Sequence, residues 1–395
     1  MKALLCHPQT QHSKKLAEIL YINNELYKFV NPSRISKENA DKLPEYIRGK
    51  LESRIIDLPA SIVENNFPLE LYRLFQQKIL KKKGREFYYN YREEYQKSIK
   101  NKHILASDAV ISYDSSSWIL GKRIKELGRP FLLERTIAHH NYSIGNFNIA
   151  SQKYPDWSSY YAREKVDQKY ISLENQELEL ADYVVAGSSF VKQSLIAEGV
   201  LDTKIIVNPY GVGLDGLTHC VNKKHDHLTF LFLGTISARK GMPTLLKAWQ
   251  QLSPKDAKLI IAGFGDLPQN IVLPKNVDFI GAIHPDKRNE LFAAADVFVF
   301  PSLLEGMAQV LVEAAVCGLP IIATETSGAA EIVEEGINGF VIKANDENAL
   351  MERMDYFIKN PEKASAMGSA LIDNIRNKFS MEAYGQRWSK ILSTV

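Results

Sequence analysis

Residues 300–340, which read FPSLLEGMAQVLVEAAVCGLPIIATETSGAAEIVEEGINGF, decide the fold of this chain. Apolar residues recur at helical spacing after Gly306, and Gly318 followed by Pro320 ends the predicted helix. The apolar run at residues 319–323 then predicts a short strand. The order of strand end, loop, helix and strand is typical of a parallel α/β sheet.

Two glutamates in this stretch are candidate functional residues. Glu305 lies in the predicted loop, and Glu313 follows eight residues later, inside the predicted helix. A single glutamate at either place is usually a solvated residue, an ion-pair partner or a helix-capping acid. However, a loop that opens a helix is also a natural anion site, because free N–H groups and the helix dipole point toward it.

The frame around the two glutamates carries more information than their spacing. Pro-Ser at residues 301–302 precedes Glu305, and the pattern E-A-A-x-x-G-x-P begins at Glu313. The pattern T-S-G-A-A-E-I-V-x-x-G-x-N-G-F follows at residues 326–340. This frame resembles the C-terminal half of the retaining glycosyltransferases of family 4 (glycosyl transferases group 1). The resemblance implies an α/β, GT-B fold: two Rossmann-like domains that face each other across a cleft, with a C-terminal helix that crosses back to the N-terminal domain.

Length and composition limit the other possibilities. A chain of 395 residues is too long for one ordinary core, so we expect two domains. The net charge of +3 gives no reason to expect a nucleic-acid partner. Three scattered cysteines without a C-x-x-C pair indicate a reducing compartment and neither zinc nor disulfides. No apolar run approaches the ~20 residues of a membrane helix, and the first residues do not resemble a secretory leader, so we expect a cytoplasmic protein.

The domain boundaries follow from a break in periodicity. Residues 209–215 (PYGVGLD) are rich in Gly and Pro and resemble the family's interdomain segment. We therefore predict an acceptor-binding N-terminal domain at 1–212 and a linker at 213–226. A sugar-nucleotide-binding domain is predicted at 227–378, and residues 379–395 form the helix that returns to the first domain.

The loop GTISARKG after the strand at 228–233 is a candidate phosphate site. Arg239 and Lys240 stand at the end of a strand and before a helix, where an Arg fork and a Lys point charge suit a diphosphate. Alone, they would be read as exposed loop cations. In the family this loop ends in Lys-Gly, which Lys240 matches, but Thr235 stands where the family commonly has Arg.

Two further segments are weaker candidates for the donor site. The turn GFGD places Gly263 and Gly265 where the family has a G-x-G turn that lines the nucleotide pocket, although a tight turn explains the two glycines equally well. After the predicted strand at 130–134, Arg135 and His139 resemble the family's R-x-x-x-H, whose histidine lies near the donor sugar. The adjacent His140 leaves that assignment ambiguous.

Residues 68–102 depart from the alternation of strands and helices, and they are predicted to be helical. Within them, residues 78–102 are basic and aromatic, and Lys81, Lys82, Lys83 and Arg85 stand beside Phe87, Tyr88, Tyr89 and Tyr91. One interpretation is a contact with an anionic membrane surface or with a phosphate-bearing acceptor. We favour the other, a solvated helical excursion whose tyrosines pack on the domain, because charge runs are usually solvated.

The resemblance implies a metal-independent transfer of a sugar from a nucleotide-diphosphate sugar, with no cofactor. The acceptor would be a hydroxyl of a glycan, a lipid-linked molecule or another compound, and the anomeric configuration would be retained. The site residues implied for the donor are Arg239, Lys240, Gly306, Met307, Ala308, Glu313, Gly263 and Gly265. Glu305, His139 and Lys240 are the implied catalytic residues, and no D-x-D pair suggests a metal.

In this scheme the cations and the N–H groups of Gly306, Met307 and Ala308 stabilise charge on the leaving phosphate. Glu313 accepts hydrogen bonds from the ribose, while Glu305 and His139 hold the donor sugar. Two alternatives remain open. One is a sugar-nucleotide epimerase or hydrolase of the same shape, and the other is a catalytically degenerate scaffold subunit of a glycosyltransferase complex. Both could use the same nucleotide pocket.

Overall fold

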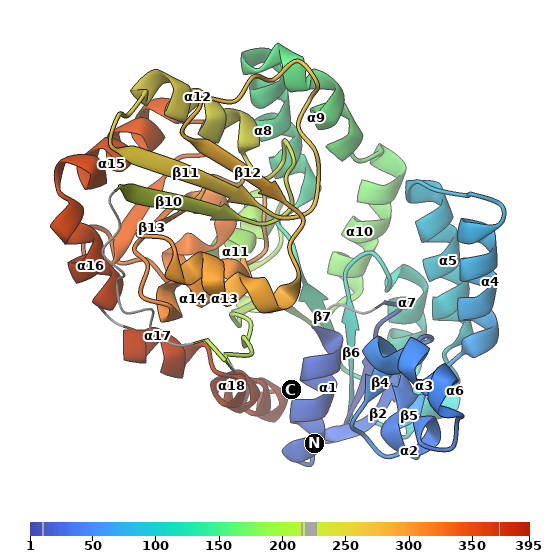
Figure 1. Cartoon of the computed structure of the whole chain (residues 1–395). Coiled ribbons are helices and arrows are strands. Elements are labelled where there is room, and N and C mark those ends of the chain that lie inside the picture. The colour runs from blue at the N-terminus through green and yellow to red at the C-terminus, as the bar shows by residue number, and fades with distance from the viewer. Residues whose placement is uncertain (10–11, 215, 218–226, 371) are drawn as a thin grey trace.

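Two parallel β-sheets, each covered by helices, face each other in the computed structural model of this chain (Figure 1). The structure describes residues 1–9, 12–214, 216–217, 227–370 and 372–395. The N-terminal sheet has the order β5 (Val63–Glu64), β2 (Leu26–Val30), β1 (Ala3–Cys6), β6 (Ala109–Tyr113), β7 (Phe131–Arg135), β8 (Tyr183–Ala186) and β9 (Ile205–Val207). Its central strands are apolar runs that are buried on both faces, as a parallel sheet between two helical layers requires.

Helices of the N-terminal domain connect these strands. They are α1 (Ser13–Ile22), α2 (Lys37–Ala40), α3 (Glu45–Leu51), α4 (Phe67–Lys78), α5 (Arg85–Ser98), α6 (Asn101–Leu105), α7 (Trp118–Glu126), α8 (His140–Lys153), α9 (Ser158–Glu164), α10 (Gln168–Leu180) and α11 (Ser189–Ala197). Among the described residues, no helix combines the length and the apolar composition needed to cross a lipid bilayer.

The C-terminal sheet has the same kind of construction. Its order is β12 (Val277–Gly281), β11 (Ala257–Ala262), β10 (Leu228–Leu233), β13 (Val297–Phe300), β14 (Ile321–Thr324) and β15 (Gly339–Ile342), with parallel pairing throughout. The helices of this domain are α12 (Met242–Leu252), α13 (Arg288–Ala293), α14 (Gln309–Val316), α15 (Glu347–Lys359), α16 (Pro361–Ser369) and α17 (Ile372–Lys378). Two parallel α/β domains were predicted, and the structure confirms them. The predicted linker lies mostly outside the described residues.

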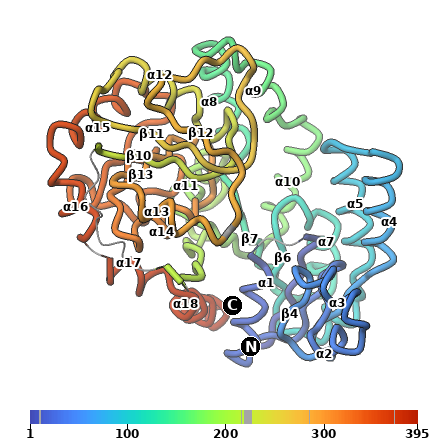
Figure 2. The backbone as a smooth tube through the Cα atoms, in the orientation of Figure 1, coloured from blue at the N-terminus to red at the C-terminus, as the bar shows by residue number. Residues whose placement is uncertain are grey.

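The last helix, α18 (Met381–Ser393), returns to the N-terminal domain and lies beside α1 (Figure 2). Gly385 allows this approach, because a Cβ there would lie 2.7 Å from the side chain of Ile19. Ser389 donates to the Glu25 carboxylate over 2.8 Å, and the Tyr384 hydroxyl donates to Glu134 over 3.2 Å. The predicted crossing back of the C-terminal helix is therefore confirmed.

A second connection between the domains was not predicted. Helices α8 and α9 form an arm of the N-terminal domain (Figure 1), and residues 153–157 of this arm line a cavity together with residues of α12 in the other domain. Lys153 donates to the carbonyl oxygen of Asn345 over 2.9 Å, and the hydroxyl of Tyr154 donates to Glu347 over 3.2 Å. The two domains are thus joined through this arm as well as through α18.

Three elements differ from the sequence prediction. The amphipathic pattern of residues 160–181 predicts a single helix, but the structure has two, because Asp167 caps a new one by accepting from the Lys169 N–H over 2.8 Å. The apolar run at residues 54–58 predicts a strand, but only β4 (Ile55–Ile56) forms, and it pairs with β3 (Ile35–Ser36) outside the main sheet. Strands β2 and β5, which were not predicted, extend the main sheet beyond β1 instead.

Candidate active site

A cavity of about 520 Å³ lies at the carboxyl ends of β10 and β13, facing the cleft between the domains. Carboxyl ends of parallel strands are where α/β folds bind their ligands. We name this cavity the Glu305 pocket. It is lined by Leu233, Gly234, Thr235, Lys240, Ile283, Arg288, Phe300, Glu305, Met307, Ala308, Gln309, Val310 and Glu313. Both predicted glutamates and the predicted lysine therefore share one cavity, although they come from three separate loops and helices.

Glu305 and Lys240 form a close ion pair in this pocket. The Lys240 ammonium lies 2.5 Å from Oε1 of Glu305, and the Ser302 hydroxyl donates to the same oxygen over 2.6 Å. Burial by itself would raise the pKa of Glu305, but the charges of Lys240 and Arg239 outweigh it and lower that pKa. Glu305 is consequently a carboxylate at neutral pH, able to accept hydrogen bonds from hydroxyl groups.

Burial also disfavours the charged form of Lys240. Burial lowers the pKa of its ammonium group, and the pairing with Glu305 only partly restores it. The ammonium also lies 5.2 Å from the centre of the Phe300 ring, on its face. A buried cation with a single carboxylate partner can exchange that partner for a more highly charged anion. Lys240 is therefore suited to a phosphate group that enters the pocket.

Arg239, the other predicted cation, supports the pocket from outside. Its Nη1 donates to the carbonyl oxygen of Leu304 over 2.7 Å and to Glu305 over 3.1 Å. Its Nε lies 3.8 Å from the carboxylate of Glu164, which belongs to the arm of the N-terminal domain. The residue is not among those that line the pocket. It positions the loop that carries Glu305, and this position does not fit a direct contact with a diphosphate.

Glu313 pairs with a cation that the sequence reading missed. Arg288, at the start of α13, donates to Oε1 of Glu313 over 2.7 Å, and both residues line the pocket. Burial raises the pKa of Glu313, although Arg288 and the more remote Lys15 of α1 work against this shift. Helix α14 begins at Gln309, so Glu313 lies one turn inside it. The only sequence signal for Arg288 was its place shortly after the loop 282–285 beyond β12.

Backbone groups of residues 306–308, which were predicted to face the phosphate, already take part in hydrogen bonds. The Ala308 N–H donates to the carbonyl oxygen of Ser327 over 3.0 Å, so it is not free for a phosphate. The carbonyl oxygen of Gly306 accepts from the Ser188 hydroxyl of the N-terminal domain over 2.5 Å. A Cβ on Gly306 would lie 1.8 Å from the carbonyl oxygen of Thr136. This glycine is therefore required where the two domains touch.

The G-x-G turn has a structural explanation. Gly263 and Gly265 have φ values of +136° and +129°, which favour glycine. A Cβ on Gly263 would lie 1.8 Å from the carbonyl oxygen of Gly234, and one on Gly265 would lie 2.3 Å from that of Ile236. Neither glycine lines the pocket. They shape the loop 234–236 from behind, so the prediction of direct donor contact is not supported by this arrangement.

His139 does not lie in the Glu305 pocket. It is buried at the start of α8, where Nδ1 accepts from the Asn141 N–H over 3.2 Å and Nε2 lies 2.8 Å from Oδ1 of Asn175. Its ring borders a different cavity, beside Glu198 and Lys204. Burial lowers the pKa of His139, which fits a neutral helix cap better than a catalytic group. The structure therefore places His139 apart from the Glu305 pocket, and its role beside the donor sugar stays a prediction.

The adjacent His140 belongs to a buried ionic network behind the domain contact. Its Nε2 lies 3.2 Å from Oε1 of Glu174, whose other oxygen accepts from Arg135 over 3.0 Å. Asp114 accepts from the hydroxyl of Thr136, the residue whose carbonyl oxygen faces Gly306. The network thus fixes the end of β7 against the loop that carries Glu305. The sequence pattern favoured His139 over His140. In the structure His139 caps helix α8, and His140 is the histidine that joins the buried ionic network.

The residues that line the Glu305 pocket lie within the part of the chain that matches a known family. Residues 220–372 match the family model of the glycosyl transferases group 1. The GDP-mannose-dependent monoacylated alpha-(1-6)-phosphatidylinositol monomannoside mannosyltransferase of Corynebacterium glutamicum is 31% identical over 170 residues, which cover 40% of this chain and 44% of that protein. The putative colanic acid biosynthesis glycosyltransferase WcaL of Salmonella typhimurium is 22% identical over 73% of this chain and 71% of its own. The chain spans about half the length of several curated relatives that it matches.

Solved structures resemble the whole chain. The sucrose-phosphate synthase of Thermosynechococcus elongatus covers 100% of this chain and 98% of its own, with a TM-score of 0.65 and 17% identity. HepE of Anabaena, in complex with UDP and glucose, covers both chains fully, with a TM-score of 0.63 and 16% identity. The predicted GT-B fold is thereby confirmed. The chain is a two-domain GT-B protein, and its residues 220–372, which include the lining of the Glu305 pocket, match the family model of the glycosyl transferases group 1.

Proposed function

We propose that this protein transfers a sugar from a nucleotide-diphosphate sugar to a hydroxyl acceptor, with retention of anomeric configuration and without a metal ion. The observation that carries this proposal is the Glu305 pocket. Two carboxylates and two cations, paired as Lys240 with Glu305 and Arg288 with Glu313, line one cavity at the cleft edge of the C-terminal sheet. A nucleotide-diphosphate sugar offers the complementary groups, which are two phosphates and two sets of hydroxyls.

Lys240 is the residue we assign to the leaving diphosphate. Negative charge grows on the phosphate nearest the sugar as the bond to the anomeric carbon breaks, and a partly desolvated ammonium stabilises that charge strongly. Binding of the diphosphate would replace the present partner of Lys240. Glu305 would then be released toward the donor sugar, where an ionised carboxylate accepts from hydroxyl groups. Two cationic side chains in the pocket supply charge that a divalent metal supplies elsewhere, which supports metal independence.

Arg288 and Glu313 are assigned to the nucleoside end of the donor. A carboxylate accepts from two neighbouring ribose hydroxyls, and a guanidinium can donate to phosphate or to a base edge. The nucleotide is left to experiment. HepE was solved with UDP, and the Corynebacterium relative is named as GDP-mannose-dependent. Both nucleotides therefore belong in the first screen.

Peripheral membrane contact is part of the proposal, and helix α4 supports it. Leu71, Phe75 and Ile79 recur every four residues on one exposed stripe of this helix, with 64%, 52% and 65% of their surface accessible. The turn that follows carries the lysines of residues 81–83. The tyrosines of α5 at positions 89, 91 and 95 face inward, as the solvated-excursion interpretation expected. An apolar stripe next to basic residues is typical of a surface that lies on an anionic bilayer.

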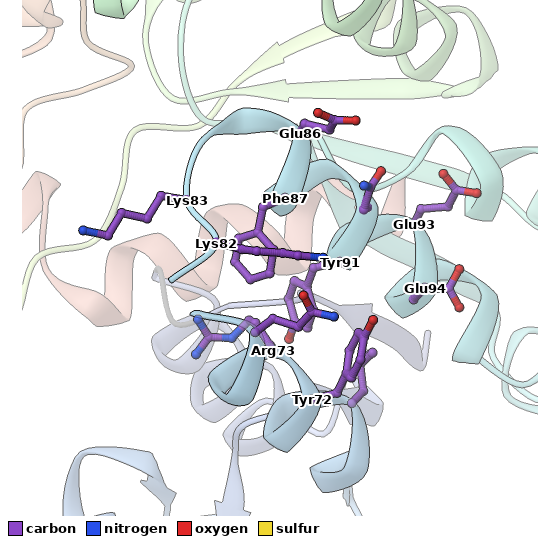
Figure 3. A pocket seen from close by; sticks show the side chains of 12 residues that line it. Tyr72, Arg73, Lys82, Lys83, Glu86, Phe87, Tyr91, Glu93 and Glu94 are labelled. Atoms are coloured by element: carbon purple, nitrogen blue, oxygen red, sulfur yellow. The ribbon is translucent and has the colours of Figure 1, made fainter. Parts of the chain in front are cut away.

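Figure 3 shows a cavity of about 550 Å³ between α4 and α5, beside this turn. Lys83 and the guanidinium group of Arg73 lie on one side of it, and Glu93 and Glu94 lie on the other.

To test the membrane contact, Leu71, Phe75 and Ile79 would all be replaced by Ser. The variant should no longer float with vesicles of phosphatidylcholine and phosphatidylglycerol, whereas equal flotation would remove this part of the proposal.

The main test measures nucleotide binding and sugar transfer with the full chain. We expect UDP or GDP to raise the melting temperature, since a ligand that binds only the native state stabilises it. EDTA should not change that shift. Transfer to an acceptor should keep the anomeric configuration of the donor, as determined by NMR of the product. Release of free sugar at turnover rates without any acceptor would favour a hydrolase. Absence of a shift with every nucleotide would favour a scaffold subunit and overturn the proposal.

A further inference from the structure

A second cluster of charged residues lies on the N-terminal domain. Glu70 of α4 is buried, and Arg73 holds both of its oxygens with hydrogen bonds of 2.8 Å from Nε and Nη2. Nη2 of Arg54 lies 3.2 Å from Oε1 of the same carboxylate. Arg34, which is also buried, donates to the carbonyl oxygen of Ser53, next to Arg54. Two guanidinium groups thus share the Glu70 carboxylate, and a third, that of Arg34, lies beside the segment that carries Arg54.

The balance of charge in this cluster favours an anion. Glu18 also acts on Arg34, but it is itself paired with Lys14 at 3.7 Å. Burial lowers the pKa of Arg34, and the charge of Arg54 adds to that effect, so the guanidinium groups repel one another. Because a buried carboxylate already held by Arg73 cannot neutralise the whole cluster, an additional anion would be stabilised there.

The cluster borders a cavity of about 390 Å³ that we name the Arg54 pocket. It is lined by Pro8, Gln9, Ser33, Ser53, Arg54, Glu70, Arg73 and Tyr88. Ser33, Ser53 and Tyr88 therefore line the same space as Arg54 and Arg73. The Ser33 hydroxyl already donates to Oδ1 of Asn31 over 3.0 Å, which leaves Ser53 and Tyr88 as the hydroxyl donors. The Tyr88 hydroxyl accepts from Gln77 over 3.4 Å, and a hydroxyl that accepts one hydrogen bond can still donate one. Guanidinium and hydroxyl donors together match the oxygens of a phosphate group.

The Arg54 pocket lies at one edge of the N-terminal sheet. Pro8 and Gln9 follow β1, and Ser33 follows β2, so the pocket opens at the carboxyl edge of the N-terminal sheet. The Asn31 side chain holds this edge together by donating to the carbonyl oxygens of His7 and Gln9 over 2.9 and 2.6 Å. Helix α5 is tied to the same loop, because the hydroxyl of Tyr91 donates to the carbonyl oxygen of Pro8 over 3.2 Å.

We propose that the Arg54 pocket binds the phosphate group of the acceptor, so that the acceptor of this protein is a phosphate-bearing hydroxyl compound. This inference rests on the proposed function, because it places the donor in the Glu305 pocket and the acceptor on the opposite domain. The phosphate can belong to a lipid headgroup or to a free phosphate ester. The pocket recognises the phosphate oxygens in either case, and the apolar stripe of α4 bears only on the lipid form.

The test must keep phosphate probes out of the Glu305 pocket. Glycerol 3-phosphate and inorganic phosphate would be titrated by calorimetry into the full chain, with the best nucleotide diphosphate present at saturation. Arg54→Gln is the main variant, since Glu70 keeps both hydrogen bonds from Arg73 and the fold should persist. Arg48→Gln is the matched control, because Arg48 is an exposed arginine of the same domain outside the pocket. Ser33→Ala and Tyr88→Phe provide milder changes should the arginine variant fail to fold.

We expect Arg54→Gln to weaken binding of the soluble phosphates by about tenfold or more, which is the size of one lost charge-assisted hydrogen bond. Arg48→Gln should bind as the wild type does. If only phosphatidylglycerol vesicles bind, and Arg54→Gln weakens that binding relative to phosphatidylcholine vesicles, the phosphate comes from a lipid headgroup. Binding of soluble phosphate by the variant lacking the α4 stripe would identify a free ester.

Two results would overturn the inference. One is phosphate binding that disappears when nucleotide fills the Glu305 pocket, or that survives Arg54→Gln unchanged. The other is failure of both soluble phosphate and anionic vesicles to bind while the nucleotide binds normally. If instead the nucleotide fails to bind and phosphate still binds at Arg54, the proposed function is wrong and the anion site stands. The two failures are therefore distinguishable.

Discussion

The Glu305 pocket and the Arg54 pocket are built on the same plan in the two domains. Each places a buried carboxylate among cations at the carboxyl edge of a parallel sheet. In the Glu305 pocket the closest cation is a lysine, whose pKa is lowered by burial. In the Arg54 pocket the cations are arginines, and Arg73 holds the carboxylate with two hydrogen bonds.

This difference in cation type indicates different tasks. A lysine is a point charge on a flexible stem, so it can follow a phosphate whose charge changes during a reaction. Arginine forks are rigid and stay charged, so they hold a group that does not react. The lysine pocket is thus suited to the leaving diphosphate of a donor, and the arginine pocket to a fixed handle on an acceptor. The predictions below test whether the two pockets act separately and how the fold couples them.

The largest effect is expected from loss of the charged residues of the Glu305 pocket. Lys240→Ala or Glu313→Ala should weaken nucleotide binding by more than about a hundredfold, because the first removes the cation assigned to the diphosphate and the second removes the carboxylate that pairs with Arg288. Phosphate binding at the Arg54 pocket should remain. Titration calorimetry with UDP and GDP measures both quantities, and Lys247→Ala, an exposed lysine on α12, is the control. Wild-type nucleotide affinity in either variant would contradict the assignment of this pocket.

A smaller effect is expected at the contact between the two domains. Gly306→Ala would place a Cβ 1.8 Å from the carbonyl oxygen of Thr136, so the loop or the domain must shift. We expect kcat to fall by about tenfold to a hundredfold, since small displacements of aligned groups cost that much, while each pocket still binds its ligand. Gly145→Ala is the control, because no atom lies within 4 Å of its added Cβ. Equal losses in the two variants would show that the contact does not matter for the reaction.

The two glutamates of the Glu305 pocket should differ in their response to pH. Burial raises the pKa of Glu313, so it takes up a proton above the ordinary glutamate value of about 4.3 as the pH falls. Nucleotide affinity should therefore decline by about threefold to tenfold across that window, as a neutral carboxyl group accepts hydrogen bonds less well. Glu305, whose pKa is lowered by Lys240, stays ionised there. In Glu313→Gln this pH dependence should vanish, and its persistence would assign the titration to another group.

The same pKa shifts predict opposite effects on stability. Glu305 has a lowered pKa in the folded protein, so its contribution to stability is present above the ordinary value and is lost as the pH falls. Glu313 has a raised pKa, so its contribution is present at low pH and is lost as the pH rises through the folded pKa. Melting temperatures of Glu313→Gln and the wild type should therefore approach or cross with rising pH.

The smallest effect is expected where the last helix joins the two domains. Tyr384→Phe removes one hydrogen bond, 3.2 Å from the hydroxyl to Glu134, which keeps its contact with His12 at 2.8 Å. A loss of about 1 kcal/mol is the usual size for such a bond. The urea midpoint should fall slightly, with both pockets still binding. Tyr46→Phe, an exposed tyrosine, is the control, and an equal change in it would show that the hydrogen bond contributes nothing.

Sequence patterns predicted the C-terminal domain in more detail than the N-terminal one. There, long apolar strands alternate with amphipathic helices, and both glutamates lie in one continuous stretch that runs from the end of β13 into α14. In the N-terminal domain, β5 has only two residues and β2 mixes buried with half-buried positions, so neither has a clear period. The Arg54 pocket also escaped prediction, because its arginines come from separate segments that only the folded chain brings together.

The sequence by itself determined the two parallel α/β domains, the returning C-terminal helix, and a site containing Glu305, Glu313 and Lys240. These follow from local periodicity and from motifs within single loops, where neighbours in sequence are neighbours in space. Only the tertiary structure decided that Arg288 pairs with Glu313 and that His139 caps a helix. It also decided that Arg54 and Arg73 meet at Glu70. The physical reason is that ion pairs and close contacts depend on distances between elements, which no local pattern specifies.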